Sequence, residues 1–202
     1  MQFWIFKIAL IAVCVLIVVA AKRATGRAQE KHTCSFDAFN AHKTEIKSLL
    51  WIRGILGIPA YVFIVEWLLP NTYFAWAYIR YPVYVNWIGL LLLVLSAAFL
   101  WWAFRSIQTE YHGTIGFHDE HFLVTTGAYK YLRHPINVSF IPVMVSIFLV
   151  TSNWMLGVLL IPVSTIVCLV RSPFEETQLL DRFGEEYIEY MKRTGRYFPE
   201  SV

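Results

Sequence analysis

The polar segment Gly127-Ala-Tyr-Lys-Tyr-Leu-Arg-His-Pro135 runs directly into the apolar run Ile136–Val150. Such an abrupt change of polarity is typical of the start of a membrane helix. A charge at this position is costly unless it is paired, hydrated or used in function, so Arg133 and His134 are candidate site residues. A simpler hypothesis is that Lys130 and Arg133 only anchor the cytoplasmic end of a span. The segment by itself leaves both interpretations open.

The composition predicts an integral membrane protein. Hydrophobic residues make up 57% of the chain, charged residues only 15%, and the mean hydropathy is +0.53, which together exclude an ordinary soluble domain. The 202 residues can hold about five spans of roughly 20 residues with modest loops. We therefore expect an all-α bundle of about five transmembrane helices without a separate soluble domain. The net charge of +3 carries little information, and we expect no nucleic-acid partner.

Five apolar runs define the expected spans. They are Phe3–Ala21, Leu49–Leu69, Val83–Phe104, Ile136–Val150 and Asn153–Val170. The first is followed by Lys22-Arg23 rather than by small residues, so we expect it to be retained rather than cleaved as a signal peptide. Within the second, Arg53 and Glu66 are expected to extend their charged ends toward the interfaces. Only Thr151-Ser152-Asn153 separates the last two runs, which predicts a helical hairpin.

The chain is expected to have two parts and a defined orientation. Residues 1–104 form three N-terminal spans, and residues 105–202 form a catalytic region of loop, hairpin and tail. Lys and Arg are frequent in residues 22–48, whereas residues 70–82 hold only Arg80. The positive-inside rule then places the first loop in the cytoplasm. With five spans the N-terminus is outside, and the 105–135 loop and the C-terminal tail are both cytoplasmic.

The tail is expected to begin a new helix after the fifth span. Ser172 fits an N-cap, Pro173 the first helical position, and Glu175 the acidic position of a capping box. Gly184 can end or bend this helix. The residues that follow alternate between apolar and charged with helical spacing, which predicts an amphipathic helix lying back on the bundle.

Several short patterns occur in a fixed order along the second half of the chain. They are Gly127–Pro135, Ser152-Asn153-Trp154, Arg171-x-Pro173-x-Glu175-Glu176, Phe183-Gly184-x-Glu186-Tyr187-x-x-Tyr190 and Thr194-Gly195-Arg196-x-Phe198-Pro199. In order and spacing, this region of about residues 125–200 resembles the isoprenylcysteine carboxyl methyltransferase family, whose wider group includes phospholipid methyltransferases. Residues 1–100 match only as generic spans. One departure is Asn137, where many relatives have Tyr.

The resemblance implies methyl transfer from S-adenosyl-L-methionine at the cytoplasmic membrane face, with a lipid-like acceptor entering sideways between helices. The chain has no Gly-rich strand–turn–helix fingerprint, so a cofactor pocket would have to be built from loops over the bundle. The residues that we assign to the cofactor are Tyr129, His134, Pro135, Asn137, Glu175, Tyr187, Tyr190 and Arg196. The residues that we assign to catalysis are Arg171, Glu176 and Arg133.

The acceptor decides which chemistry the site needs. A carboxylate is already ionised at neutral pH, so its methylation requires alignment and desolvation rather than a base. Arg171 is the preferred partner of that carboxylate, with Arg133 or Arg196 as alternatives. An amine acceptor would need a base, for which Glu176 and His134 are the candidates. We expect a lipophilic small molecule or a prenylated acceptor, in contact with membrane lipid.

Other classes of function remain open at this point. A methyltransferase for a phospholipid amine or a small thiol would share the same patterns, and a transporter or a non-catalytic membrane subunit would share the spans. Cys14, Cys34 and Cys168 do not suggest a disulfide or a zinc site. The acidic and histidine residues between His112 and His121 form only a weak pattern for a metal. We therefore expect no metal centre.

Overall fold

The computed structural model describes residues 2–30, 45–69, 73–109 and 123–199. Its α-helices are α1 (Gln2–Glu30), α3 (Glu45–Leu68), α4 (Val83–Thr109), α5 (Pro135–Thr151), α6 (Trp154–Phe183) and α7 (Glu185–Arg193). Two short 3-10 helices, η1 (Ala75–Ala77) and η3 (Gly127–Lys130), lie between them. The described part of the chain contains no strand, so the predicted all-α class is confirmed.

The helices are apolar enough to make this a membrane protein. Among the described residues, Trp4–Arg23, Val83–Ile107 and Trp154–Phe183 have the length and hydropathy of membrane spans. Ile55–Leu68 and Pro135–Thr151 are apolar but shorter. At about 1.5 Å per residue, the 17 residues of α5 reach about 25 Å, less than a hydrocarbon core of about 30 Å. The predicted bundle is confirmed, and α5 is short for a membrane span.

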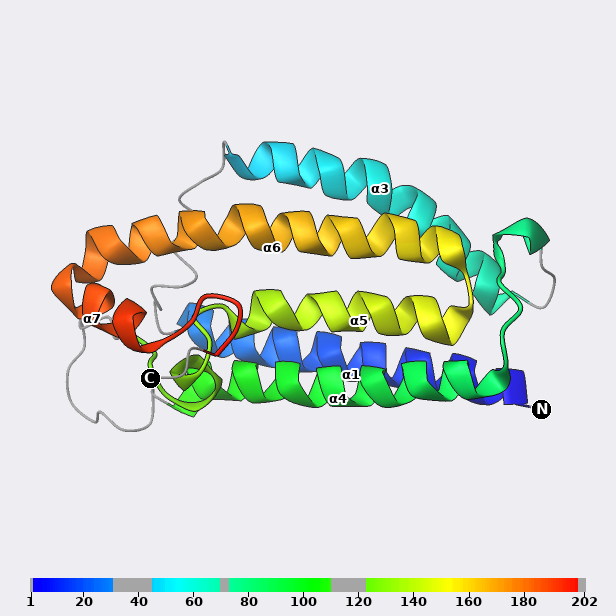
Figure 1. Cartoon of the computed structure of the whole chain (residues 1–202), viewed down its shortest axis with the longest axis horizontal. Helices are drawn as coiled ribbons and strands as arrows, with labels where there is room; N and C mark the ends of the chain where they lie inside the picture. Colours follow the sequence, from blue (N-terminus) through cyan, green and yellow to red (C-terminus); the bar gives the residue numbers. More distant parts are fainter. Residues whose placement is uncertain (1, 31–44, 70–72, 110–122, 200–202) are drawn as a thin grey trace.

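The bundle is organised around α4 and α5, which run side by side in Figure 1. α1 packs on α4, α6 packs on α5, and α3 packs on α6. α4 and α5 approach closely at Gly89, where a Cβ atom would lie only 2.6 Å from the Cβ of Leu149. Helices in lipid gain most of their packing energy from such close contacts between small and large residues.

The predicted hairpin between α5 and α6 is confirmed. Ser152 has a left-handed backbone conformation, with φ 57°, and Asn153 caps α6 by accepting a hydrogen bond from the Leu156 amide at 3.2 Å. The turn is fixed from outside, because the Ile79 amide donates to the Ser152 carbonyl at 2.8 Å. The side-chain amide of Asn86 also donates to the Ser152 hydroxyl at 2.8 Å. The segment before α4 and the first turn of α4 therefore hold the closed end of the hairpin.

Glu66 does not reach toward the membrane interface, and that expectation is wrong. Its exposed fraction is only 3%, and its carboxylate accepts hydrogen bonds from the Tyr78 hydroxyl and the Phe74 amide. Lys7 is buried beside it and donates to the carbonyls of Leu68 and Leu69 at the end of α3. The chain after α3 folds back and supplies partners inside the protein, so the charge does not have to reach water. The side chain of Arg53 lies outside the described residues.

The tail does not begin with a new helix at Ser172. α6 continues unbroken from Trp154 to Phe183, so Ser172 is a buried helical residue and Pro173 lies inside the helix. A proline there removes only one backbone hydrogen bond, which the contacts of the extended helix can offset. Gly184, with φ 53°, ends α6 and starts α7, as predicted. α7 buries Tyr187 and Tyr190 and exposes its charged residues, which confirms the amphipathic tail helix.

Candidate active site

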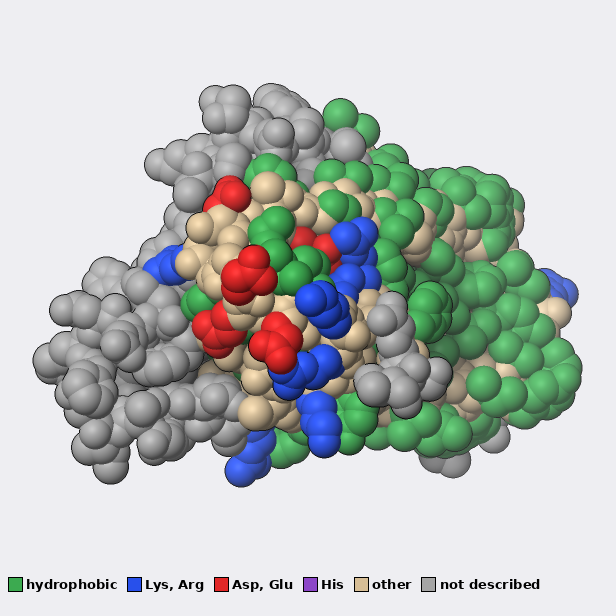
Figure 2. Space-filling view, turned by 60° about the vertical axis from the view of Figure 1, so that its left-hand side comes forward, with side chains coloured by type: hydrophobic (Ala, Val, Ile, Leu, Met, Phe, Trp, Pro, Cys, Tyr) green, Lys and Arg blue, Asp and Glu red, His purple; other side chains and the backbone are tan. Residues whose placement is uncertain are grey.

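The candidate site lies at the end of the bundle opposite the hairpin turn (Figure 1). At this end α5 begins, α6 extends beyond the last residue of its apolar stretch, Val170, and α7 folds back with the residues that follow it. Figure 2 shows acidic and basic side chains gathered at this end, while the rest of the visible described surface is mainly hydrophobic. The polar chemistry is therefore concentrated beyond the apolar parts of the helices.

His134 stands between two carboxylates. It is the N-cap residue of α5 and only 5% exposed. Its Nδ1 lies 3.2 Å from Glu175 Oε2, and its Nε2 lies 3.2 Å from Glu176 Oε1. Burial lowers the pKa of His134, but its hydrogen bonds to both carboxylates and their charges outweigh burial and raise the pKa above 6.5. The geometry fits an imidazolium that donates from both ring nitrogens.

Glu176 accepts hydrogen bonds from three cationic side chains. Besides His134, it binds Arg133 Nε at 2.9 Å and Arg196 Nε at 3.0 Å, and a second nitrogen of Arg196 contacts its other oxygen. Burial raises the pKa of Glu176, but hydrogen bonds from His134 and Arg196 and the charge of Arg133 lower it to about 2. The carboxylate is therefore ionised and fully engaged.

Arg133 points into the protein rather than toward a membrane interface. Its side chain is 12% exposed, and its Nη1 donates to the carbonyls of Met191 at 2.9 Å and Thr194 at 2.6 Å. Its own amide donates to the Gly195 carbonyl at 2.9 Å. These bonds fasten the end of α7 and the tail to the start of α5. The simpler hypothesis of a positive anchor is therefore wrong for Arg133, although Lys130 is exposed.

Glu175 and Arg171 are the more accessible members of the same cluster. Their side chains are 27% and 31% exposed, and they form an ion pair one turn apart on α6. The side-chain amide of Asn137 donates to Glu175 Oε2 at 3.2 Å and lies 3.4 Å from the Ser172 hydroxyl. Charges therefore alternate along a continuous series. The series runs from Arg171 through Glu175, His134 and Glu176 to Arg133 and Arg196.

The predicted tyrosines lie at the interface between α7 and the loop before α5. Tyr187 is fully buried, and its ring lies 5.8 Å from that of Tyr190. The Tyr190 hydroxyl donates to the Tyr129 carbonyl at 2.7 Å, so Tyr129 joins this contact through its backbone. Pro135 is buried at the first position of α5. The structure thus brings all the predicted site residues to one end of the bundle, while their roles remain predictions.

The contact that positions this loop could hardly be predicted from the sequence. Gly127 has φ 59° and lies against α4, where an added Cβ would be 2.2 Å from the Ser106 Oγ and 2.7 Å from the Ser106 Cβ. The Ser106 hydroxyl accepts a hydrogen bond from the Ala128 amide at 2.9 Å. The only signal was a serine near the end of a largely apolar run, which is too common a feature to identify a contact.

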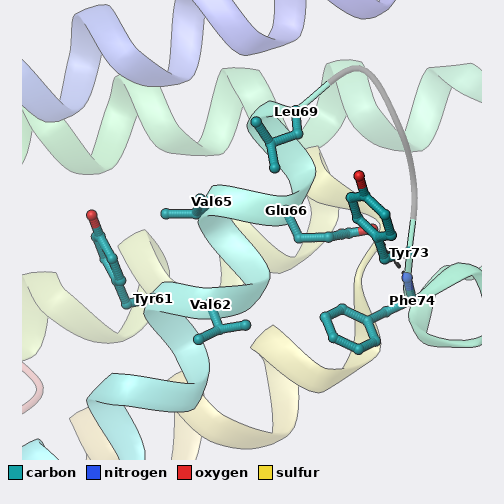
Figure 3. Close-up of a pocket in the computed structure, with 7 residues that line it drawn as sticks. All are labelled: Tyr61, Val62, Val65, Glu66, Leu69, Tyr73 and Phe74. Carbon is teal, nitrogen blue, oxygen red and sulfur yellow. Dashed lines mark hydrogen bonds between the residues drawn. The ribbon is translucent and has the colours of Figure 1, made fainter.

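A groove on α3 and a metal centre were the other candidates for a functional site, and neither is supported within the described residues. A groove of about 290 Å³ lies on α3 near the other end of the bundle, and Figure 3 shows its mainly apolar walls. Its one acidic side chain, Glu66, is already hydrogen-bonded. Within the described residues no group of three or more His, Cys, Asp or Glu side chains could hold a metal ion. The His112–His121 segment and Cys34 lie outside the described residues.

The fold and the site together define a polytopic helical membrane protein with a charged site at one end of its bundle. Residues 89–181 match the family model of isoprenylcysteine carboxyl methyltransferase (ICMT). This match confirms the resemblance seen in the sequence and supports a membrane methyltransferase. Members of the family use S-adenosylmethionine. No curated protein matches the chain.

The matched range differs from the range that the sequence patterns covered. It begins at Gly89, inside α4, and so includes the helix that supports the loop through Ser106. It ends at Asp181, before Tyr187, Tyr190 and Arg196. The family match therefore covers His134 and the acidic pair of α6, whereas the assignment of the tail residues rests on their local patterns and on their contacts.

Replacing Gly127 by Ala should destabilise the loop that carries His134. The new Cβ would meet Ser106 in a left-handed backbone conformation, and such strain costs about 1 to 3 kcal/mol. Unfolding in detergent would measure the loss of stability. Gly57→Ala is the control, because nothing lies within 4 Å of its added Cβ and no strained φ is involved. Equal stability of Gly127→Ala and the wild type would contradict this account.

Acid should weaken the cluster through Glu176. Its pKa in the folded protein, about 2, lies below the ordinary glutamate pKa of 4.5, so its stabilising contribution is present above about pH 4.5 and is lost as the pH falls toward 2. Thermal unfolding between about pH 6 and pH 3 should show a smaller acid destabilisation for Glu176→Gln than for the wild type, by about 2 kcal/mol. Glu189→Gln, in an exposed pair with Arg193, should leave the profile nearly unchanged. Identical slopes for wild type and Glu176→Gln would refute the assignment.

Proposed function

We propose that the protein transfers the methyl group of S-adenosyl-L-methionine to the carboxylate of a lipophilic acceptor, such as a prenylated cysteine. The observation that carries this proposal is the alternating series of charges at the site end of the bundle. Its four cationic side chains, counting the imidazolium of His134, surround only two carboxylates. An excess of positive charge favours an anionic acceptor.

The state of Glu176 and His134 supports a carboxylate over an amine or a thiol. An amine or thiol acceptor must lose a proton, so its methylation needs a general base. Glu176, with a pKa of about 2 and three cationic partners, is a poor base. Both ring nitrogens of His134 are engaged with carboxylates. A carboxylate needs no base, so these two residues can serve as fixed structural charges without loss of activity.

The residues at the site fit the proposed cofactor chemically. At the site end of the bundle, the buried atoms Gln178 Oε1 and Tyr187 Oη have no hydrogen-bond partner among the described residues. Such atoms are costly to leave unsatisfied, and a polar ligand would supply their bonds. Gln178 lies almost one turn beyond Glu175 on α6, and the Glu175 carboxylate remains partly exposed. S-adenosylmethionine, when bound, supplies an electrophilic methyl group on a sulfonium.

We assign the roles as follows. Glu175 would bind the amino or ribose groups of the cofactor, and His134 would hold Glu175 in place through its Nδ1. Arg171 lies just after the apolar part of α6 and is 31% exposed, so its guanidinium can bind a carboxylate whose apolar chain stays in the membrane. Arg133, Glu176 and Arg196 would close the site by holding the tail against the start of α5.

The cofactor part of the proposal is tested by isothermal titration of S-adenosylmethionine into the full-length protein in detergent. The wild type should bind, and His134→Ala should bind about 10- to 100-fold more weakly, because the charge-assisted contacts that position Glu175 are lost. Arg193→Ala, at an exposed position on α7, should bind like the wild type. Absence of binding by folded wild type at millimolar cofactor would overturn the proposal.

The acceptor part is tested separately by turnover on a prenylated cysteine. Arg171→Ala should lower turnover by about 10- to 100-fold while the cofactor affinity changes only a few-fold, because one charge-assisted contact to the acceptor is removed. Arg171→Lys should keep part of the activity, since the charge remains but the bidentate geometry does not. If Arg171→Ala abolished cofactor binding while His134→Ala left it intact, the division of roles would be wrong.

We further propose that the site faces the cytoplasm, as the distribution of Lys and Arg among the loops indicates. A single cysteine placed after Glu200, in a variant without the native cysteines, should react with a membrane-impermeant reagent only after the cytoplasmic face is opened. A cysteine placed at Arg80, in the segment between α3 and α4, is the matched control and should react in intact cells. The reverse pattern of labelling would require the opposite orientation.

A further inference from the structure

A patch of exposed cationic and aromatic residues lies beside the site, at the end of α4 and in the loop that contacts it. We call it the α4–η3 patch, and it consists of Trp101, Trp102, Arg105, Lys130 and Tyr131. The Arg105 guanidinium lies 5.2 Å from the centre of the Trp101 ring, and the Trp102 ring lies 6.1 Å from that of Tyr131. All five residues are exposed, Trp101 and Tyr131 by about half.

The patch is held together by the same contacts that fix η3 on α4. Ser106, the residue after Arg105, accepts a hydrogen bond from the Ala128 amide and contacts Gly127. Trp102 lies one turn earlier on α4 and contacts Tyr131, the residue after Lys130. Lys130 is thereby fixed close to the cationic end of α4 although it is distant in sequence.

The chemistry of the patch matches one kind of partner. Tryptophan and tyrosine rings favour the boundary between lipid tails and headgroups, and each Lys or Arg near the membrane surface attracts anionic lipid. In the part of the chain that the structure describes, no acidic side chain pairs with Lys130. The patch therefore combines the positive charge and the aromatic rings that favour the headgroup region of a membrane.

We propose that the α4–η3 patch binds the headgroup of an anionic phospholipid in the leaflet on the side of the site. Lys130 and Arg105 bind the phosphate, and the rings of Trp102 and Tyr131 contact the glycerol and the upper part of the chains. The residues after Tyr131 lead directly to Arg133 and His134, and Leu132 pairs with Gly195 of the tail. A lipid bound here therefore steadies the loop on which the charged cluster is built.

The experiment uses the full-length protein reconstituted into bilayers of phosphatidylcholine with a minor fraction of phosphatidylglycerol. After mild extraction, native mass spectrometry measures how much of each lipid stays bound. The wild type should retain phosphatidylglycerol in preference to phosphatidylcholine. Lys130→Ala should retain about fivefold less of it, as expected for one cation near an anionic surface. Lys130→Arg should restore retention, and Arg80→Ala, which removes an exposed cation near the other end of the bundle, should leave it unchanged.

Thermal unfolding gives a second measurement that does not depend on extraction. Phosphatidylglycerol should raise the unfolding temperatures of the wild type and of Arg80→Ala. It should raise the unfolding temperature of Lys130→Ala by a smaller amount. Equal retention by wild type and Lys130→Ala, or an equal loss in Arg80→Ala, would overturn the proposal. Complete displacement of the lipid by millimolar inorganic phosphate would also overturn it, because the patch would then be a site for soluble anions. Neither measurement requires methyl transfer, so failure here is distinguishable from failure of the proposed function.

Discussion

The site end of the protein depends on the buried carboxylate of Glu176. It accepts hydrogen bonds from Arg133 and His134 at the start of α5 and from Arg196 in the tail. A single buried charge costs several kcal/mol if it is left unpaired, and less when its lone pairs are fully used. The cost of burying this carboxylate is therefore offset only when α5, α6 and the tail come together. One side chain thus couples three segments that are distant in sequence.

The same pairing limits the chemistry that these residues can perform. A carboxylate with three cationic partners loses basicity, and an imidazolium between two carboxylates has no free nitrogen with which to accept a proton. The charges that stabilise the site are therefore unsuited to proton transfer. Methylation of an acceptor that is already ionised requires only that the reacting groups be held in line and kept from water. The stability of the cluster and the proposed reaction are consistent with each other for this reason.

The two ends of the bundle are held by different interactions. At the hairpin end, Asn86, Ser152 and the segment before α4 exchange neutral hydrogen bonds, many of them to backbone carbonyls. The buried charges at that end, Glu66 and Lys7, are hydrogen-bonded to neutral groups. At the site end the contacts are mainly between full charges. Charged contacts are stronger than neutral ones but respond to pH and to charged ligands. The site end is therefore expected to respond to pH and to charged ligands more than the hairpin end.

The sequence by itself determined the class of protein, the apolar segments that form its helices and the resemblance to the family. Apolar runs and turn residues such as Ser152 and Gly184 act through the chain next to them, so their effects can be predicted locally. It also gave the members of the charged cluster. Tertiary structure alone decided that α6 continues through Pro173, that Glu66 is buried, and that Arg133 points inward. Each of these outcomes depends on contacts with residues distant in sequence. The free-energy cost of burying a charge, for example, depends on whether such a residue supplies a hydrogen bond or an opposite charge.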